Sequence, residues 1–547
     1  MSPVISSRRV LFLLLPLFAA ARAGASDYYV SLSGSDSNVG SSFFPFRQIR
    51  RALTAAVPGD TIFVADGSYL GFDVAGKNGT ASAILTIRAL GQSANILPTS
   101  DRSDNRDTIH VSASAYVVIE GLRAANGNRA AVRVNASDHV TIRNGVFGDN
   151  ATWGIFTNHS DDLLIEGNVC HGSVAEHGIY VSNSGDRPVV RGNRCYGNRG
   201  AGVQLNADAS QGGDGLITGA LIENNVLSGN GTGGGGAINL DGVQDSIVRN
   251  NLLYDNHASG ITNFQGDGAA GPKGMRILNN TIDQPADGRW AVLIRDTAGA
   301  NFLRNNILLN RHAFRGGVVF GAAADAAATD SDFNVLDWIS TDDGATRISL
   351  SQWKALGHDS SSLSATIASL FVNPAAADYH LSPGSPARDR GAALPDAPQD
   401  LEGRARPSGP AFDIGCYEYF VSRASVFFTV TPCRIADTRN PNGLYGGPAL
   451  VANSERGFTA AGRCGIPATA AALSVNLTVT QPSASGNLRL FAGGMIAPLA
   501  SAVNYSAGQT RANNALVGLG TGGGLTVRCD QPAGMAHVVL DVNGYFE

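Results

Sequence analysis

Residues 221–256 read LIENNVLSGNGTGGGGAINLDGVQDSIVRNNLLYDN. A short β-forming run that ends in paired asparagines, 221–225, returns 26 positions later as 247–251. A second β-run, 237–240, stands between the two copies and follows a string of glycines. Self-similarity with a period of about 20–50 residues is typical of solenoids, in which each repeat forms one turn. The stretch therefore predicts stacked turns that each carry at least two strands.

The same pattern extends along the chain in both directions. The residues that mark the repeat lie 23, 25, 32, 26, 29 and 26 positions apart, at Gly145, Asn168, Asn193, Asn225, Asn251, Asn280 and Asn306. Asn and Gly tolerate the left-handed backbone of a sharp corner, and stacked amides can form hydrogen-bonded ladders. We therefore expect these asparagines at inward corners, as structural residues without a catalytic role. The fold class that follows is all-β, with a right-handed parallel β-helix as its main body.

The second strand of each repeat alternates apolar and polar residues. A period of two places one set of side chains inside the turn and the other set outside it. The expected inward residues are Ile179, Val181, Val203, Leu205, Ile238, Leu240, Val292 and Ile294. The expected outward residues, on one stacked sheet, are Tyr180, Gln204, Asn206, Asn239, Asp241, Leu293 and Arg295. A leucine-rich repeat is excluded because no helical segment separates the strands.

The N-terminus has the features of a signal peptide over residues 1–25. Arg8 and Arg9 precede an apolar run from Val10 to Phe18, and small residues around Ala23 suit a cleavage site. The apolar run is too short to span a bilayer, so we expect export without a transmembrane anchor, to the medium or the cell surface. An uncleaved anchor is the alternative.

Export makes the six cysteines potential disulfide partners. Cys170 and Cys195 occupy matching places in neighbouring repeats, which permits a disulfide, a thiol stack or two small buried hydrophobic residues. The pairing of the remaining four stays open at this stage; these are Cys416, Cys433, Cys464 and Cys529.

Two groups of motifs carry a resemblance to known proteins. Tyr28-Tyr29-Val30-Ser31, Gly34-Ser35-Asp36 and Pro58-Gly59-Asp60-Thr61 stand near the start, and Phe371-Val372-Asn373-Pro374 and Asp413-Ile414-Gly415-Cys416 near residue 420. They resemble the entry and exit segments of secreted right-handed parallel β-helix proteins of the pectate-lyase-like superfamily. The resemblance implies a solenoid domain over residues 26–420 with a helical N-terminal cap. It also implies a carbohydrate-active protein, since the superfamily holds lyases, hydrolases, epimerases and non-catalytic adhesins.

The pattern changes from about Val426. Short β-forming runs that alternate with Gly- and Pro-containing turns predict a small antiparallel β-sandwich over residues 426–547. Pro432-Cys433-Arg434 and Asp437-Thr438-Arg439 resemble an uncharacterised C-terminal module of secreted bacterial proteins. The resemblance implies a binding or attachment role.

The two longest repeats contain insertions at residues 207–219 and 266–274, both after the second strand. Insertions stacked on one side of a solenoid tend to wall a binding face. We expect this groove to hold catalytic residues Lys273, Arg295 and His177, substrate-binding residues Tyr180, Gln204, Asn206 and Asn239, and metal ligands Asp208, Asp241 and Asp267. Asp241 and Lys273 are expected to be exposed.

This set of residues favours cleavage of a uronic-acid-containing polysaccharide by Ca²⁺-assisted β-elimination. The cation would neutralise the sugar carboxylate, and a basic side chain would remove the adjacent proton. A glycoside hydrolase using the same acids, a non-catalytic glycan-binding protein and a structural spacer remain alternatives. A net charge of −5 without basic runs gives no reason to expect nucleic acid, and a monomer is expected.

Overall fold

The computed structural model describes residues 24–98, 106–420, 426–520 and 522–547. The predicted signal peptide lies outside this part of the chain, apart from its last two residues. No helix in the described ranges is long and apolar enough to cross a membrane. The chain divides after Phe420 into two compact units, which are described separately below.

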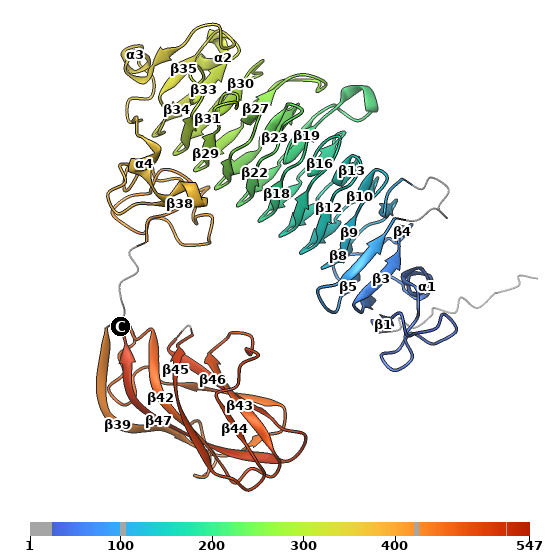
Figure 1. Ribbon diagram of the computed structural model, residues 1–547, viewed down its shortest axis with the longest axis vertical. Helices are drawn as coiled ribbons and strands as arrows, with labels where there is room; N and C mark the ends of the chain where they lie inside the picture. The colour runs from blue at the N-terminus through green and yellow to red at the C-terminus, as the bar shows by residue number, and fades with distance from the viewer. Residues whose placement is uncertain (1–23, 99–105, 421–425, 521) are drawn as a thin grey trace, which may run out of the picture. The chain divides into compact units, whose positions relative to one another are not determined.

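Most turns of the first unit contribute one strand to each of three parallel sheets, in the chain order A, B, C, and the first and last turns contribute fewer (Figure 1). Sheet A consists of β1 (Asp27–Val30), β2 (Thr61–Val64), β5 (Leu85–Ala89), β8 (Val117–Glu120), β11 (Thr141–Arg143), β14 (Leu164–Glu166), β17 (Val189–Arg191), β21 (Leu221–Glu223), β25 (Ile247–Arg249), β28 (Arg276–Leu278), β31 (Asn301–Arg304) and β34 (Thr329–Asp332). Sheet B consists of β3 (Gly67–Leu70), β6 (Ala94–Leu97), β9 (Arg123–Ala125), β12 (Val146–Gly148), β15 (Val169–His171), β18 (Arg194–Tyr196), β22 (Val226–Ser228), β26 (Leu252–Tyr254), β29 (Thr281–Gln284) and β32 (Ile307–Asn310). Sheet C consists of β4 (Phe72–Ala75), β7 (Ile109–Ser112), β10 (Ala130–Asn135), β13 (Trp153–Asn158), β16 (Ile179–Ser182), β19 (Val203–Asn206), β23 (Gly236–Asp241), β27 (Ser259–Phe264), β30 (Val292–Ile294), β33 (Val318–Phe320), β35 (Trp338–Ser340) and the antiparallel β36 (Ile348–Ser349).

The alternation predicted for the second strand is that of sheet C. Val203 and Leu205 of β19 are fully buried, and they stack in register on Ile238 and Leu240 of β23. One apolar core continues in this way through the turns of the solenoid. Because inward side chains fill the interior, any ligand must bind on the outer faces.

The repeat asparagines form a hydrogen-bonded ladder at the corner between sheets A and B. The Asn225 side-chain oxygen accepts from the backbone N–H of Asn193 at 2.9 Å, and its amide donates to Val190 O at 2.9 Å. The same backbone-to-side-chain bond recurs from turn to turn, running from Gly145 through Asn168, Asn193, Asn225, Asn251, Asn280, Asn306 and Asn334 to Ser362. The predicted inward corners are therefore confirmed.

Replacing Asn225 by Ala is expected to lower the free energy of unfolding by about 3–5 kcal/mol. The residue is fully buried, and its loss leaves the Asn193 N–H and the Val190 carbonyl without side-chain partners, each at about 1–3 kcal/mol. Denaturant unfolding of the first unit measures the change. Asn224→Gly is the matched control, because Asn224 adopts a left-handed φ of 55° that glycine tolerates. Equal effects of the two variants would contradict a structural role for the ladder.

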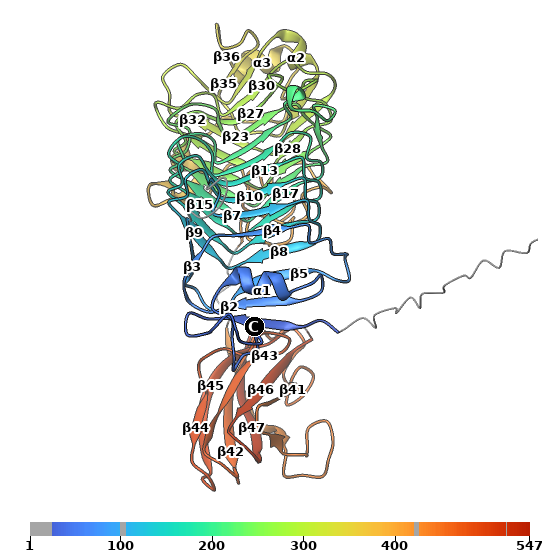
Figure 2. The ribbon, with the colours of Figure 1, turned by 90° about the vertical axis from the view of Figure 1, so that its right-hand side faces the viewer.

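Helices close both ends of the solenoid. At the N-terminal end, α1 (Ile49–Ala55) buries Ile49, Ala52 and Leu53 beside the first strands (Figure 2). At the other end lie α2 (Ala323–Ala327) and α3 (Leu350–Ala355), and Trp353 of α3 packs on Phe320 of β33. The chain then returns through α4 (Ile367–Leu370), β37 (Phe371–Asn373) and β38 (Asp378–Leu381). The helices α1, α2 and α3 cover core that the terminal turns would otherwise expose. The returning segment instead packs on the outer face of sheet B, where Tyr379 contacts Tyr254 of β26.

The second unit consists of two small antiparallel sheets that share one apolar core. The first sheet contains β39 (Phe427–Asp437), β40 (Leu450–Val451), β42 (Ala472–Thr480), β45 (Arg511–Gly518) and β47 (Met535–Phe546), and the second contains β41 (Ser454–Thr459), β43 (Gly486–Ala492), β44 (Val503–Tyr505) and β46 (Gly524–Asp530). Cys433 and Cys464 form a disulfide. The other four cysteines are free and buried, so Cys170 and Cys195 stack in register without a bond.

Candidate functional site

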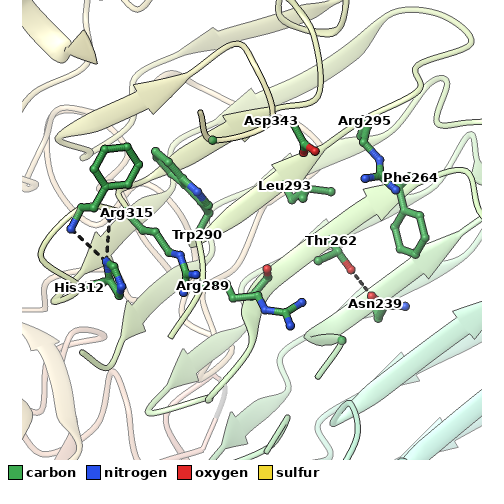
Figure 3. Close-up of a pocket in the computed structure, with 14 residues that line it drawn as sticks. Asn239, Thr262, Phe264, Arg289, Trp290, Leu293, Arg295, His312, Arg315 and Asp343 are labelled. Carbon is green, nitrogen blue, oxygen red and sulfur yellow. Dashed lines mark hydrogen bonds between the residues drawn. The ribbon is translucent and has the colours of Figure 1, made fainter. Parts of the chain in front are cut away.

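A cavity of about 490 Å³ opens on the outer face of sheet C (Figure 3). Its floor comes from β23, β27 and β30, through Asn239, Thr262 and Leu293. Its remaining walls come from turns that precede strands of sheet C, which carry Arg289, Trp290, His312, Phe314 and Arg315, and from Asp343 after β35. Residues far apart in sequence therefore meet here because successive turns stack.

Three arginines dominate the charge of the cavity. Arg289 and Arg315 lie beside Trp290, and Arg295 lies beside Phe264 on the other side (Figure 3). Arg295 contacts Asp296 at 3.1 Å and its guanidinium carbon stands 5.7 Å from the Phe264 ring centre. Neither Arg289 nor Arg315 forms an ion pair with any residue in the described ranges. The cavity thus offers guanidinium groups to an anion together with aromatic surface.

His312 presents a hydrogen-bond donor to the cavity. Its Nδ1 accepts from the backbone N–H groups of Phe314 at 3.0 Å and Arg315 at 3.1 Å. A neutral ring that accepts at Nδ1 carries its proton on Nε2. The ring therefore cannot take a proton at Nε2 in this tautomer, and it serves as a donor.

Asp343 is the one carboxylate among the lining residues. Its backbone N–H donates to Phe320 O at 3.0 Å, and its side chain is exposed, with no hydrogen bond to another described residue. Neighbouring Asp342 fixes the loop, since its carboxylate accepts from the backbone and the hydroxyl of Thr346. These bonds lower the pKa of Asp342 to about 2. The loop thus holds Asp343 at the cavity with its lone pairs available.

The expectation that Asp241 is exposed is wrong. The residue is only 3% exposed, because the insertion at 266–274 folds over it. Its carboxylate accepts backbone N–H groups from Gly266 at 2.7 Å, Asp267 at 2.7 Å and Gly268 at 3.2 Å. Asp241 is therefore occupied in shaping this insertion.

Asp208 and Asp267 are likewise engaged within the insertions. Asp208 caps η1 (Ala209–Gln211) by accepting from the hydroxyl and the N–H of Ser210, which lowers the pKa of its carboxyl group. The Asp267 carboxylate accepts from the Asn206 amide at 3.2 Å. Over the described part of the chain, no three His, Cys, Asp or Glu side chains are grouped to hold a metal ion. These three aspartates therefore do not fit a Ca²⁺ site.

The two insertions lie side by side, as expected, but they do not line the cavity. Ala209 N donates to Asp267 O at 3.0 Å, and Ala269 N donates to Gly215 O at 2.9 Å. Lys273 is exposed on the turn from sheet C to sheet A, where its backbone forms a β-bridge to Gln244. Of the predicted site residues, Asn239 and Arg295 line the cavity.

The remaining predicted residues belong to earlier turns: Tyr180, Gln204 and Asn206 lie on strands of sheet C, and His177 lies two residues before β16. Gln204 pairs in register between Tyr180 and Asn239, so the three side chains form one row. Burial raises the pKa of Tyr180 to about 12, so its hydroxyl stays protonated. His177 Nδ1 accepts from the Ala201 N–H at 2.8 Å, and burial lowers the pKa of His177 to about 4. A neutral His177 with Nδ1 occupied does not suit the role of base.

The low pKa of His177 should make stability depend on pH. The unfolded chain protonates this histidine below its ordinary pKa of 6.5, whereas the folded chain does so only near 4. The contribution of His177 to the free energy of unfolding is therefore full above pH 6.5. It is lost as the pH falls toward 4, at about 1.4 kcal/mol per pH unit. Between pH 7 and 5 the parent should lose about 2 kcal/mol more than His177→Gln, measured by denaturant unfolding. Parallel pH profiles for the two proteins would count against this burial.

Comparison with known proteins agrees with the fold. Residues 86–234 match the family described as right handed beta helix region, and residues 32–71 match a family described only as a protein of unknown function. The crystal structure of pectate lyase Pel9A superposes with a TM-score of 0.52 at 17% identity, over 73% of this chain and 97% of that one. The predicted right-handed parallel β-helix is thereby confirmed.

Two curated relatives align with part of the chain. Pectate lyase PEL9 of Emericella nidulans is 25% identical over 44% of this chain and 69% of its own length. The mannuronan C5-epimerase of Pseudomonas putida is 24% identical over 38% of this chain and 30% of its own length. The chain therefore spans less than a third of the epimerase.

Proposed function

We propose that this chain is a secreted carbohydrate-active protein that binds an acidic, uronic-acid-containing polysaccharide across sheet C and cleaves it by β-elimination. The observation that carries the proposal is the cavity with three arginines, aromatic walls and a single carboxylate. Both curated relatives support it, since one is named for pectate and the other for mannuronan.

The residues of the cavity suit the steps of an elimination. Arg289, Arg295 and Arg315 would bind the sugar carboxylate, which offsets its charge and makes the adjacent C–H more acidic. Asp343, whose carboxylate has no hydrogen bond to a described residue, would accept that proton. The C–O bond to the next sugar would break as the C=C bond forms, and the leaving oxygen would take a proton from water. Asn239 and the Nε2–H of His312 would donate hydrogen bonds to sugar hydroxyls.

The carboxylate count favours elimination over hydrolysis. Most glycoside hydrolases need two carboxyl groups that flank the scissile bond. Asp343 is the only carboxylate among the residues that line this cavity, and Asp241, the predicted acid on β23, accepts three backbone N–H groups. The hydrolase alternative therefore lacks a second acid at this place.

Incubation with pectate, polymannuronate and a neutral glucan tests the proposal. Elimination gives unsaturated products, detected by absorbance, together with new reducing ends, and we expect both from an acidic polymer. Reducing ends without unsaturated products would establish hydrolysis instead. Binding without turnover would establish the glycan-binding alternative, and no binding would overturn the proposal. The assay is repeated with a chelator to test for calcium dependence. If the activity depends on calcium, the ion must have ligands other than Asp208, Asp241 and Asp267.

A further inference from the structure

Three aromatic side chains, Trp153, Phe156 and Tyr180, form a stack on the outer face of sheet C, outside the cavity. The ring centres of Trp153 and Phe156 lie 4.3 Å apart, and those of Phe156 and Tyr180 lie 5.4 Å apart. All three side chains are partly exposed. We call this set the aromatic platform.

The aromatic platform and the cavity share one row of outward side chains. Strand pairing places Phe156 beside Tyr180, Tyr180 beside Gln204, Gln204 beside Asn239 and Asn239 beside Thr262. Four steps of about 4.8 Å separate Phe156 from Thr262, or roughly 19 Å. A chain of several sugars that lies along the solenoid axis can therefore contact both places.

The charges around the aromatic platform are already paired. Arg129 and Arg133 both form ion pairs with Asp107, and their guanidinium carbons lie 5.9 and 5.5 Å from the Phe156 ring centre. The Trp153 indole donates to Glu176 at 2.8 Å. The cavity carries an excess of arginines, whereas the two arginines beside the aromatic platform are balanced by Asp107 and Glu176. This surface therefore suits the apolar C–H faces of sugar rings better than their carboxylates.

We propose that the aromatic platform is a second subsite, which holds sugar rings of the same polysaccharide several units away from the cavity. The inference rests on the proposed function and adds to it a preference for long chains. Short oligosaccharides bound at the cavity would not reach the aromatic platform, whereas a polymer would engage both.

Two variants test this subsite through binding measured by titration calorimetry. Phe156→Leu keeps an apolar side chain but removes the central ring. Trp153→Leu, which removes the end ring, replaces it if Phe156→Leu lowers the melting temperature. The probes are pectate and polymannuronate, each as polymer and as trimer. We expect the Kd for the polymer to rise about tenfold and the Kd for the trimer to stay unchanged.

Tyr196→Leu is the matched control. Tyr196 stacks on His171 with ring centres 5.0 Å apart, but this pair lies on sheet B. The control should bind polymer as the parent does. If both platform variants keep the parent Kd for polymer, the subsite is wrong while the proposed function stands. If the parent binds neither polymer, the proposed function and the subsite fall together.

Discussion

Asp343→Asn is expected to lower kcat on an acidic polysaccharide by about 100- to 10,000-fold, with little change in KM. A positioned side chain that transfers a proton contributes a factor of this size. Asn has nearly the same shape as Asp but is not a useful base at neutral pH. Because the loop is fixed by Asp342 rather than by the Asp343 carboxylate, the fold should survive the change.

Asp287→Asn is the matched control for that variant. Asp287 is an exposed carboxylate on a nearby turn, where it contacts His257 at 2.7 Å and does not line the cavity. Initial rates of unsaturated-product formation over a range of polymer concentrations separate kcat from KM. If the Asp343→Asn protein keeps the parent kcat, Asp343 is not the base that accepts the proton.

Replacing Arg289 and Arg295 together by Gln is expected to reduce kcat/KM on the acidic polymer at least about 100-fold. A hydrogen bond to a charged group contributes about 1.5–3 kcal/mol, so the loss of two amounts to at least about 3 kcal/mol. Gln keeps a polar side chain and removes the positive charge. The loss should grow smaller at high salt, because screening already weakens the attraction of exposed charges in the parent.

Arg304→Gln separates this effect from a general loss of charge. Arg304 is an arginine of sheet A that contacts both oxygens of Asp330 at 2.7 Å. Its replacement should leave kcat/KM unchanged. If the double variant retains the parent kcat/KM, or if Arg304→Gln loses as much, the arginines of the cavity do not bind the substrate carboxylate.

The solenoid could be predicted from the sequence because one local rule repeats in every turn. Asn193 and Asn225 mark the same corner, and that corner needs a left-handed neighbour and a side chain that bonds the next turn. The three-strand turn was only partly foreseen. The strands of sheet B are short and alternate weakly, as in Val226–Ser228, so they are hard to separate from the corner that precedes them.

The site was harder to predict because stacking, not sequence proximity, creates it. The length of the insertions drew attention to Asp241 and Lys273, yet Asp241 binds the backbone of the 266–274 insertion, and Lys273 belongs to that insertion and does not line the cavity. Arg289, His312 and Asp343 come from three different turns of the chain. A signal was present, since Arg289-Trp290 and Arg315 stand two or three residues before strands of sheet C. Sequence alone did not establish at which turns along the outer face of sheet C the cavity would lie.

The central claim is that the cavity recognises the carboxylates of an acidic polysaccharide. The most direct measurement compares the affinity of the parent and of the Arg289→Gln, Arg295→Gln double variant for one polymer in two forms, native and carboxyl-reduced. We predict that the parent binds the native polymer at least about 100-fold more tightly than the reduced one, and that the double variant loses most of this difference. Equal affinity of the parent for the two forms would contradict the account.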